Sequence, residues 1–254
     1  MSLERPRVAQ TKDAYGEADP TSFSPVPSAL TLAPTGEYTS EKRYPIYTDG
    51  ADQYVKLMSD GPRQEVVARL LKGVLNVADV VAQPGAKGVE YFSKIMPHER
   101  IEEPSRPTDV RADLEVISLV FNDQDRGFRE EGDYSGAFAH NLIHEAGRVS
   151  HFDFGEAELN LEAPMGQRIR YENPALLERV LEKLEALRAK FAGDEGKAHF
   201  LSIIEASGQH PARLFPYSGA SANAETLYEG FVGRLDRAIR FVAHEYNELT
   251  RKAA

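Results

Sequence analysis

Hydrophobic and polar residues follow two different patterns along the chain, and the change between them falls near residue 100. Short apolar runs separated by Gly, Pro and Asp dominate the first part, and this pattern is typical of strands joined by turns. Apolar residues three and four positions apart dominate the second part, which is typical of helices with one buried face. We therefore predict an α+β protein of two lobes, a small β-rich N-terminal lobe with one helix and a mainly helical C-terminal lobe.

The N-terminal lobe is predicted to cover residues 26–97 in the order β-β-β-α-β-β. The expected strands lie at 29–32, 43–48, 53–57, 79–82 and 88–96. A turn signal at 34–36 separates the first two strands. The helix begins near Pro62, and its buried stripe consists of Val66, Val67, Leu70, Leu71, Val74 and Leu75. Residues 1–25 are polar and without a period, so we expect a disordered or loosely docked tail.

The C-terminal lobe is predicted to cover residues 98–254. A polar segment with three prolines, at 97–108, marks the boundary between the lobes. Helices are expected at 110–121, from Pro174 to a stop at Gly193, at 195–206 and at 222–250. Two short strands at 141–144 and 148–152 are expected to form a hairpin around a three-residue turn.

Composition and charge exclude several kinds of protein. The 254 residues include no cysteine, which excludes a disulfide scaffold, a thiolate nucleophile and a thiolate zinc site. Lys and Arg number 30 against 40 Asp and Glu, and the net charge of -10 argues against a nucleic-acid partner. No apolar run approaches the roughly 20 residues of a membrane span. We see no signal peptide, so we expect a cytoplasmic protein or an effector secreted into a host cell.

The segment from Asn141 to Gly155 carries the most specific chemical signal. Asp153 follows the second strand of the expected hairpin, and Asn141 stands at the start of the first strand. Because antiparallel pairing brings these two ends together, an amide oxygen and a carboxylate would converge on one point. These are the ligands that Mg²⁺ prefers. The sequence therefore predicts a magnesium site of Asn141 and Asp153, and the structural alternative is that Asp153 only caps a turn.

The run Asn141-Leu-Ile-His-Glu-Ala-Gly-Arg-Val-Ser-His-Phe-Asp153-Phe-Gly resembles the metal-binding hairpin of the protein-kinase-like superfamily. In that family the Asn and the Asp of Asp-Phe-Gly hold the magnesium ions of ATP. The resemblance covers residues 29–160 by pattern and implies a two-lobed kinase-like fold. It also implies that Lys56 contacts the ATP phosphates and that Glu65, on the following helix, holds Lys56.

The compact connection from Val55 to Glu65 is similar to the atypical branches of the superfamily, phosphoinositide-kinase-like and HipA-like, and the small size is similar to bacterial effector kinases. The resemblance places the hinge after the last strand of the sheet. There the backbone groups of Lys94, Ile95 and Met96 would pair with adenine.

The catalytic aspartate departs from the usual pattern. Ordinary kinases place it five residues before the Asn, where this chain has Gly136. Atypical lipid-kinase-like members use an Asp-Arg pair after a helix, and Asp125-Arg126 supplies one, with Asp123 as the second choice. Its role would be to orient or deprotonate an acceptor hydroxyl. The chain has no Gly-x-Gly-x-x-Gly loop, and no Ala-Pro-Glu follows Asp153.

Other interpretations of these residues stay open. Lys56 is also compatible with a solvated strand lysine, Glu65 with a first-turn glutamate favoured by the helix dipole, and Asp125 with a solvated acidic loop. A zinc hydrolase would use histidines that are close in sequence, namely His140, His144 and His151.

The function predicted from the sequence is an ATP- and magnesium-dependent phosphotransferase that acts on a hydroxyl of a protein, lipid or small molecule. The alternatives are a catalytically impaired pseudokinase that serves as a binding module, and nucleotide transfer to protein hydroxyls on the same fold, as in SelO-like relatives.

Overall fold

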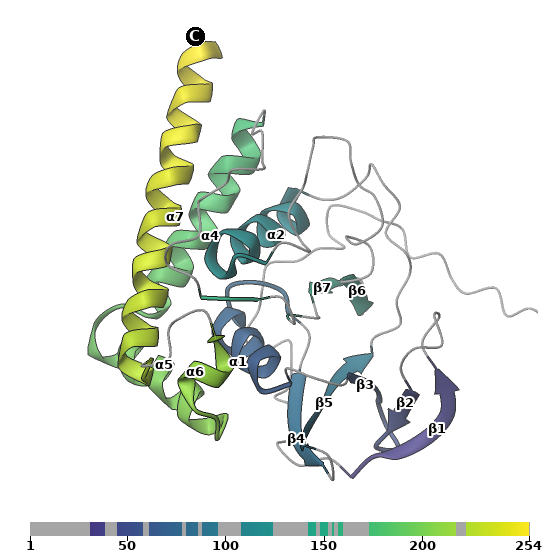
Figure 1. Cartoon of the computed structure of the whole chain (residues 1–254). Coiled ribbons are helices and arrows are strands. Elements are labelled where there is room, and N and C mark those ends of the chain that lie inside the picture. Colours follow the sequence, from purple (N-terminus) through teal and green to yellow (C-terminus); the bar gives the residue numbers. More distant parts are fainter. Residues whose placement is uncertain are drawn as a thin grey trace, which may run out of the picture.

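A five-stranded antiparallel sheet and a group of helices lie on opposite sides of one short helix, α1 (Gly61–Leu71), in the computed structural model of the chain (Figure 1). The residues that the structure describes are 31–38, 45–57, 61–77, 80–85, 88–95, 108–123, 142–145, 148–151, 154, 157–159, 173–216 and 222–253. Helix α1 contacts two neighbouring strands of the sheet, at 80–85 and 88–95, and one helix of the helical part, at 193–206. This gives the α+β arrangement that the sequence predicts.

The N-terminal sheet has the strand order β1-β2-β3-β5-β4, and every neighbouring pair is antiparallel. Its strands are β1 (Ala33–Tyr38), β2 (Pro45–Thr48), β3 (Gln53–Leu57), β4 (Val80–Gly85) and β5 (Gly88–Ile95). Since α1 lies between β3 and β4 in sequence, the predicted order β-β-β-α-β-β is confirmed.

The first strand differs from the prediction, because β1 begins at Ala33 and contains the segment 34–36 that the turn signal marked. β1 is an edge strand, and an edge is where a sheet tolerates a proline such as Pro34. Gly36 has a positive φ of 81°, and the pairing with β2 is irregular between Pro34 and Tyr38. The Thr35 hydroxyl donates to the Ile46 carbonyl (2.9 Å), which holds this irregular strand on the sheet.

Helix α1 ends earlier than its apolar stripe. The chain leaves the helix after Leu71 through Gly73, whose φ of 84° is easily adopted only by glycine. The amides of Val74 and Leu75 then donate to the Leu71 carbonyl at 3.1 and 3.0 Å, and Leu75 stays buried. The stripe therefore predicted burial correctly, whereas the helix boundary depended on one glycine.

The C-terminal part contains the predicted helices and the predicted hairpin. Its elements are α2 (Thr108–Phe121), β6 (Leu142–Glu145), β7 (Arg148–His151), α4 (Pro174–Lys190), α5 (Gly193–Ala206), α6 (Pro211–Leu214) and α7 (Ala224–Ala253). The Asn173 side chain caps α4 by accepting from the amides of Ala175 (3.0 Å) and Leu176 (3.3 Å), as the Asn-Pro signal indicates. None of the described helices is both long enough and apolar enough to cross a membrane.

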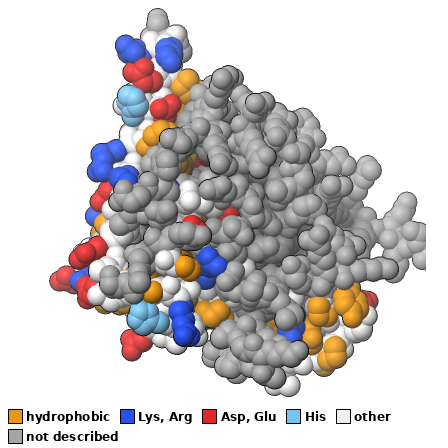
Figure 2. Space-filling model, in the orientation of Figure 1, with side chains coloured by type: hydrophobic (Ala, Val, Ile, Leu, Met, Phe, Trp, Pro, Cys, Tyr) orange, Lys and Arg blue, Asp and Glu red, His pale blue; other side chains and the backbone are white. Residues whose placement is uncertain are grey.

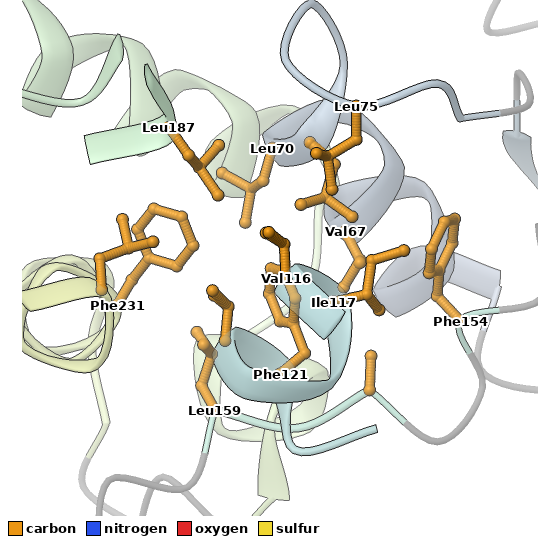
Figure 3. Close-up of a cluster of buried hydrophobic side chains, with 14 of the residues drawn as sticks. Val67, Leu70, Leu75, Val116, Ile117, Phe121, Phe154, Leu159, Leu187 and Phe231 are labelled. Atoms are coloured by element: carbon orange, nitrogen blue, oxygen red, sulfur yellow. The ribbon is translucent and has the colours of Figure 1, made fainter. Parts of the chain in front are cut away.

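One hydrophobic core joins the sheet to the helices through α1. Val67 and Leu70 of α1 belong to the same cluster as Ile117 of α2, Leu187 of α4 and Phe231 of α7 (Figure 3). Acidic and basic side chains are mixed along the outer side of α7 (Figure 2), as expected for an amphipathic helix with one buried face. The two parts of the chain are therefore held together by shared apolar burial as well as by the connecting segments.

The corner between α4 and α5 requires a glycine, and this gives a first testable prediction. A Cβ on Gly196 would lie 2.3 Å from the carbonyl carbon of Phe191, in the backbone of the preceding turn. We expect Gly196→Ala to lower the free energy of unfolding by about 1–3 kcal/mol, because the backbone must shift to relieve the overlap.

The matched control is Gly233→Ala in α7, where an added Cβ meets nothing within 4 Å. This change should raise the free energy of unfolding by about 0.5–1 kcal/mol, because glycine is unfavourable inside a helix. Urea unfolding followed by circular dichroism measures both. Equal stability of the two alanine variants would contradict the close contact at the corner.

Candidate functional site

The β6–β7 ribbon provides the geometry on which the predicted metal site depends. Leu142 pairs with His151 and Glu145 pairs with Arg148, so the strands are antiparallel and the predicted hairpin is confirmed. The start of β6 and the end of β7 therefore lie at the same end of the ribbon. Asn141 directly precedes β6 and Asp153 comes two residues after β7, but both lie outside the described residues.

The chain on either side of Asp153 is bound to α1 and to the segment that follows it. The amide of His151 donates to the Asn76 carbonyl (2.9 Å), and the amide of Phe154 donates to Oε1 of Gln64 on α1 (3.0 Å). The Phe154 ring is fully buried in the cluster that contains Val67 and Ile117 (Figure 3). The sequence pattern did not indicate that Gln64, next to the predicted Glu65, makes this contact.

The segment after Asp153 continues between the start of α1 and the end of α2. The Ala157 carbonyl accepts from Nη1 of Arg63 (3.4 Å), and the amide of Glu158 donates to the Phe121 carbonyl (2.6 Å). Asp123 lies two residues beyond Phe121 and is buried, after Asn122 turns the chain with a φ of 50°. Asp125 lies outside the described residues, so the choice between the two aspartates stays a prediction.

Lys56 lies on β3 opposite Phe92 of β5, and its side chain is partly buried. Its neighbour Val55 belongs to the core cluster that includes residues of α1. Of the predicted hinge residues, Lys94 and Ile95 are the last of β5 and pair with β3, while Met96 lies outside the described residues.

Glu65 joins α1 to the sheet. It is 8% exposed, its Oε1 accepts from Nε of Arg69 (2.9 Å), and its Oε2 accepts from the amide of Ala82 in β4, the edge strand (2.9 Å). The first turn of α1 contains no acidic residue, so the interpretation of Glu65 as a first-turn glutamate is wrong. The resemblance implies a third contact of Glu65, with Lys56. That contact stays a prediction.

The C-terminus of α1 is held by a lysine from α4. Nζ of Lys190 donates to the carbonyls of Leu70 (3.0 Å) and Lys72 (2.7 Å), and lies 3.3 Å from that of Arg69. An ammonium group at this end of a helix satisfies carbonyls that lack helical partners and opposes the helix dipole. Burial, with a smaller contribution from the charge of Lys72, lowers the pKa of Lys190 to about 8.

A buried charged cluster lies where α2, α4 and β7 meet, and the sequence interpretation missed it. Asp113 of α2 is fully buried, with Nζ of Lys183 2.9 Å from its Oδ1 and Nε2 of His151 3.6 Å from its Oδ2. The amide of Asn76 donates to the same Oδ2 (3.3 Å). One signal was present, because Lys183 falls on the apolar stripe of α4 between Val180 and Leu187, where a charge is costly without a partner.

The zinc interpretation rested on His140, His144 and His151. In the structure the His151 side chain is buried beside Asp113, His140 lies outside the described residues, and only the backbone of His144 is described. Within the described parts of the chain, no three His, Asp or Glu side chains gather in a way that could hold a metal ion.

A second buried acid lies on α2, and in the part of the chain that the structure describes it has no hydrogen-bond partner. Glu115 is 1% exposed, and neither of its carboxyl oxygens accepts a hydrogen bond from a described residue. Burial raises the pKa of Glu115 to about 8, against the opposing charge of Arg111. The group is therefore mostly protonated at neutral pH.

Comparison with known proteins identifies no family. No protein-family model matches the chain, and no curated protein matches its sequence. Among solved structures, the chain is similar to the crystal structure of a Helicobacter pylori proinflammatory kinase, CtkA. The TM-score is 0.40 at 11% sequence identity, over 87% of this chain and 97% of that chain.

Proposed function

We propose that this chain is an ATP- and magnesium-dependent phosphotransferase with a kinase-like fold, acting on a hydroxyl of a protein, lipid or small molecule. One observation carries the proposal. The residue directly after Asp153, Phe154, is hydrogen-bonded through its amide to Gln64 on α1, the helix that follows the Lys56 strand. The contact joins residues 90 positions apart and holds Phe154 against the helix that carries Glu65.

The donor chemistry of the chain fits magnesium and ATP. Asn141 and Asp153 would supply the oxygen ligands of the metal, and Lys56 would supply a cation for the phosphates. The backbone is hydrogen-bonded on both sides of Asp153, at His151 and at Phe154. We expect these bonds to lower the entropic cost of ordering the Asp153 carboxylate when the metal binds. When bound, the metal neutralises negative charge on the phosphates.

The remaining roles follow from the same proposal. Glu65 would orient Lys56, and Asp125, with Asp123 as the second choice, would orient the acceptor hydroxyl or take its proton. Backbone groups of Lys94, Ile95 and Met96 would pair with adenine. Because the net charge of the chain is -10, these local cations and the metal must overcome an unfavourable overall field for ATP.

A second candidate, a pseudokinase that binds a partner, is favoured by the contacts of Glu65. Its two oxygens accept from Arg69 and from the amide of Ala82, which gives Glu65 a structural role without any catalysis. Nucleotide transfer to a protein hydroxyl is the third candidate. It is distinguished by ATP labelled at the α-phosphate, because only then does the label stay on the acceptor.

The test combines nucleotide binding with label transfer. We expect ATP to bind with magnesium by calorimetry, and γ-labelled ATP to pass its label to a hydroxyl acceptor, either the protein itself or one from a panel of proteins, lipids and small molecules. Lys56→Met should weaken binding or transfer by about 10-fold or more, because phosphate contacts to a cation are charge-assisted. The control is Lys252→Met at an exposed position near the end of α7, which should change neither.

Three outcomes separate the candidates. Binding without any transfer supports the pseudokinase, and transfer from α-labelled ATP supports nucleotide transfer. An absence of magnesium-dependent ATP binding by the wild-type protein contradicts both transfer activities and leaves only a pseudokinase that binds its partner without nucleotide.

A further inference from the structure

We propose that Asp113 is a positioning residue of the phosphotransferase site, which holds the ribbon that leads to Asp153 in register with α1. This inference rests on the function proposed above. It starts from the placement of Asp113 on α2, where the carboxylate is fully buried and touches three segments from distant parts of the chain. These segments are the turn after α1, strand β7 and helix α4.

Each oxygen of Asp113 has a distinct neighbour. Oδ1 lies 2.9 Å from Nζ of Lys183 in α4. Oδ2 accepts from the amide of Asn76 (3.3 Å), directly after α1, and lies 3.6 Å from Nε2 of His151 at the end of β7. One carboxylate therefore connects the N-terminal part, the ribbon and the helical part.

The connection between Asn76 and His151 is closed a second time by the backbone. The His151 amide donates to the Asn76 carbonyl (2.9 Å), and Val77 forms a parallel bridge with His151. Asp113 thus stabilises a junction in which β7 adds to the segment between α1 and β4. Because Asp153 is only two residues from His151, a shift at this junction would move a metal ligand directly.

The chemistry of the cluster requires an acid at position 113. Lys183 and the Asn76 amide both offer only donors, so each oxygen of Asp113 must act as an acceptor. In Asp113→Asn, the new NH₂ group would face one of these donors. The side chain of Lys183 is 7% exposed, so loss of the carboxylate would also leave a buried cation without this counter-ion.

The variant for the test is Asp113→Asn combined with Lys183→Met. This pair removes both buried charges together, so that no unpaired charge is left to unfold the chain, and it still weakens the contacts to Asn76 and His151. Asp113→Asn combined with Lys183→Gln is the second variant, used if the first double variant does not fold, and it also leaves no unpaired buried charge. The control is Glu115→Gln, which replaces a second buried acid on the same helix; within the described residues that acid accepts no hydrogen bond from any of the three segments.

The first measurement is hydrogen exchange of the protein without nucleotide, so it does not depend on the proposed function. We expect the amides of His151 and Phe154 to exchange about 10-fold faster in the double variant, because local opening of the ribbon becomes easier. Amides of α5 and α7 should keep their rates, and Glu115→Gln should leave the ribbon unchanged. Unchanged exchange of His151 in the folded variant overturns the proposal.

The second measurement is the magnesium concentration at half-maximal ATP binding. Loss of a group that orients a metal ligand weakens metal affinity by about 10–100-fold, so the midpoint should rise by that factor in the double variant and not in Glu115→Gln. Faster exchange with an unchanged midpoint overturns the positioning role and leaves a purely structural one. If the wild-type protein shows no magnesium-dependent ATP binding, the proposed function fails and the positioning role fails with it, even where the exchange result confirms the junction.

Discussion

Asp153→Asn is expected to lower the rate of magnesium-dependent phosphate transfer by about 10³-fold, because the metal loses a charged ligand. A metal at a phosphoryl group contributes several kcal/mol to transition-state stabilisation, and roughly 1.4 kcal/mol corresponds to a factor of ten in rate. An amide retains one oxygen but loses the negative charge that binds the metal. Single-turnover transfer from γ-labelled ATP at saturating magnesium measures the effect.

The control for this prediction is Asp194→Asn, an exposed aspartate in the first turn of α5 that belongs to no proposed site. Its transfer rate should equal that of the wild-type protein. If Asp153→Asn transfers phosphate within threefold of the wild-type rate while the wild-type protein is active, Asp153 only caps a turn and the metal assignment is wrong.

The same assay decides between the two candidate acceptor-binding aspartates. Asp125→Ala should lower the transfer rate by about 10²–10⁴-fold if Asp125 orients or deprotonates the acceptor. If the loss appears in Asp123→Ala instead, the buried aspartate at the end of α2 has that role, provided that the variant unfolds at the wild-type temperature.

Glu115→Gln is expected to stabilise the protein at neutral pH, which is the largest expected effect on stability. The folded-state pKa of Glu115 is raised to about 8 by burial, above the ordinary value of 4.5. Between these two values the folded chain binds a proton that the unfolded chain has released, so stability is lost as the pH rises through this window. By pH 7 the loss amounts to about 3 kcal/mol relative to acidic solution.

Glutamine is neutral at every pH and has nearly the same shape, so Glu115→Gln should not show this loss. The difference in free energy of unfolding between the variant and the wild-type protein should be small near pH 4.5, grow up to about pH 8 and then stay constant. Urea unfolding at four pH values measures it. A difference that is independent of pH, or no larger than that of the exposed control Glu185→Gln, would show that Glu115 is charged in the folded protein.

Much of the fold follows from local sequence signals. The stripe from Val66 to Leu75 predicted both the helix and its burial, and Asn173-Pro174 predicted the start of α4. The first strand was misplaced because Pro34 and Gly36 are common in turns but are also tolerated at the edge of a sheet. Whether a strand is central or at an edge depends on its neighbours, which one segment of sequence does not specify.

The candidate site was predictable only as a set of separate segments. The hairpin of β6 and β7 was predicted from a turn signal between two short apolar runs, and its pairing is confirmed. The assignment of Glu65 as the partner of Lys56 came from a resemblance, and the contacts of Glu65 with Arg69 and Ala82 could not be predicted from it. Lys56 itself is placed on β3 as expected.

The sequence by itself determined the order of strands and helices, the faces that are buried and the local caps, because these depend on residues within about one turn or one strand of each other. Only the tertiary structure decided which polar groups meet. Asp113 and Asn76 are 37 positions apart, and Gln64 and Phe154 are 90 apart. Contacts at such separations depend on how α1 packs between the sheet and the helices, and no periodicity along the chain encodes that packing.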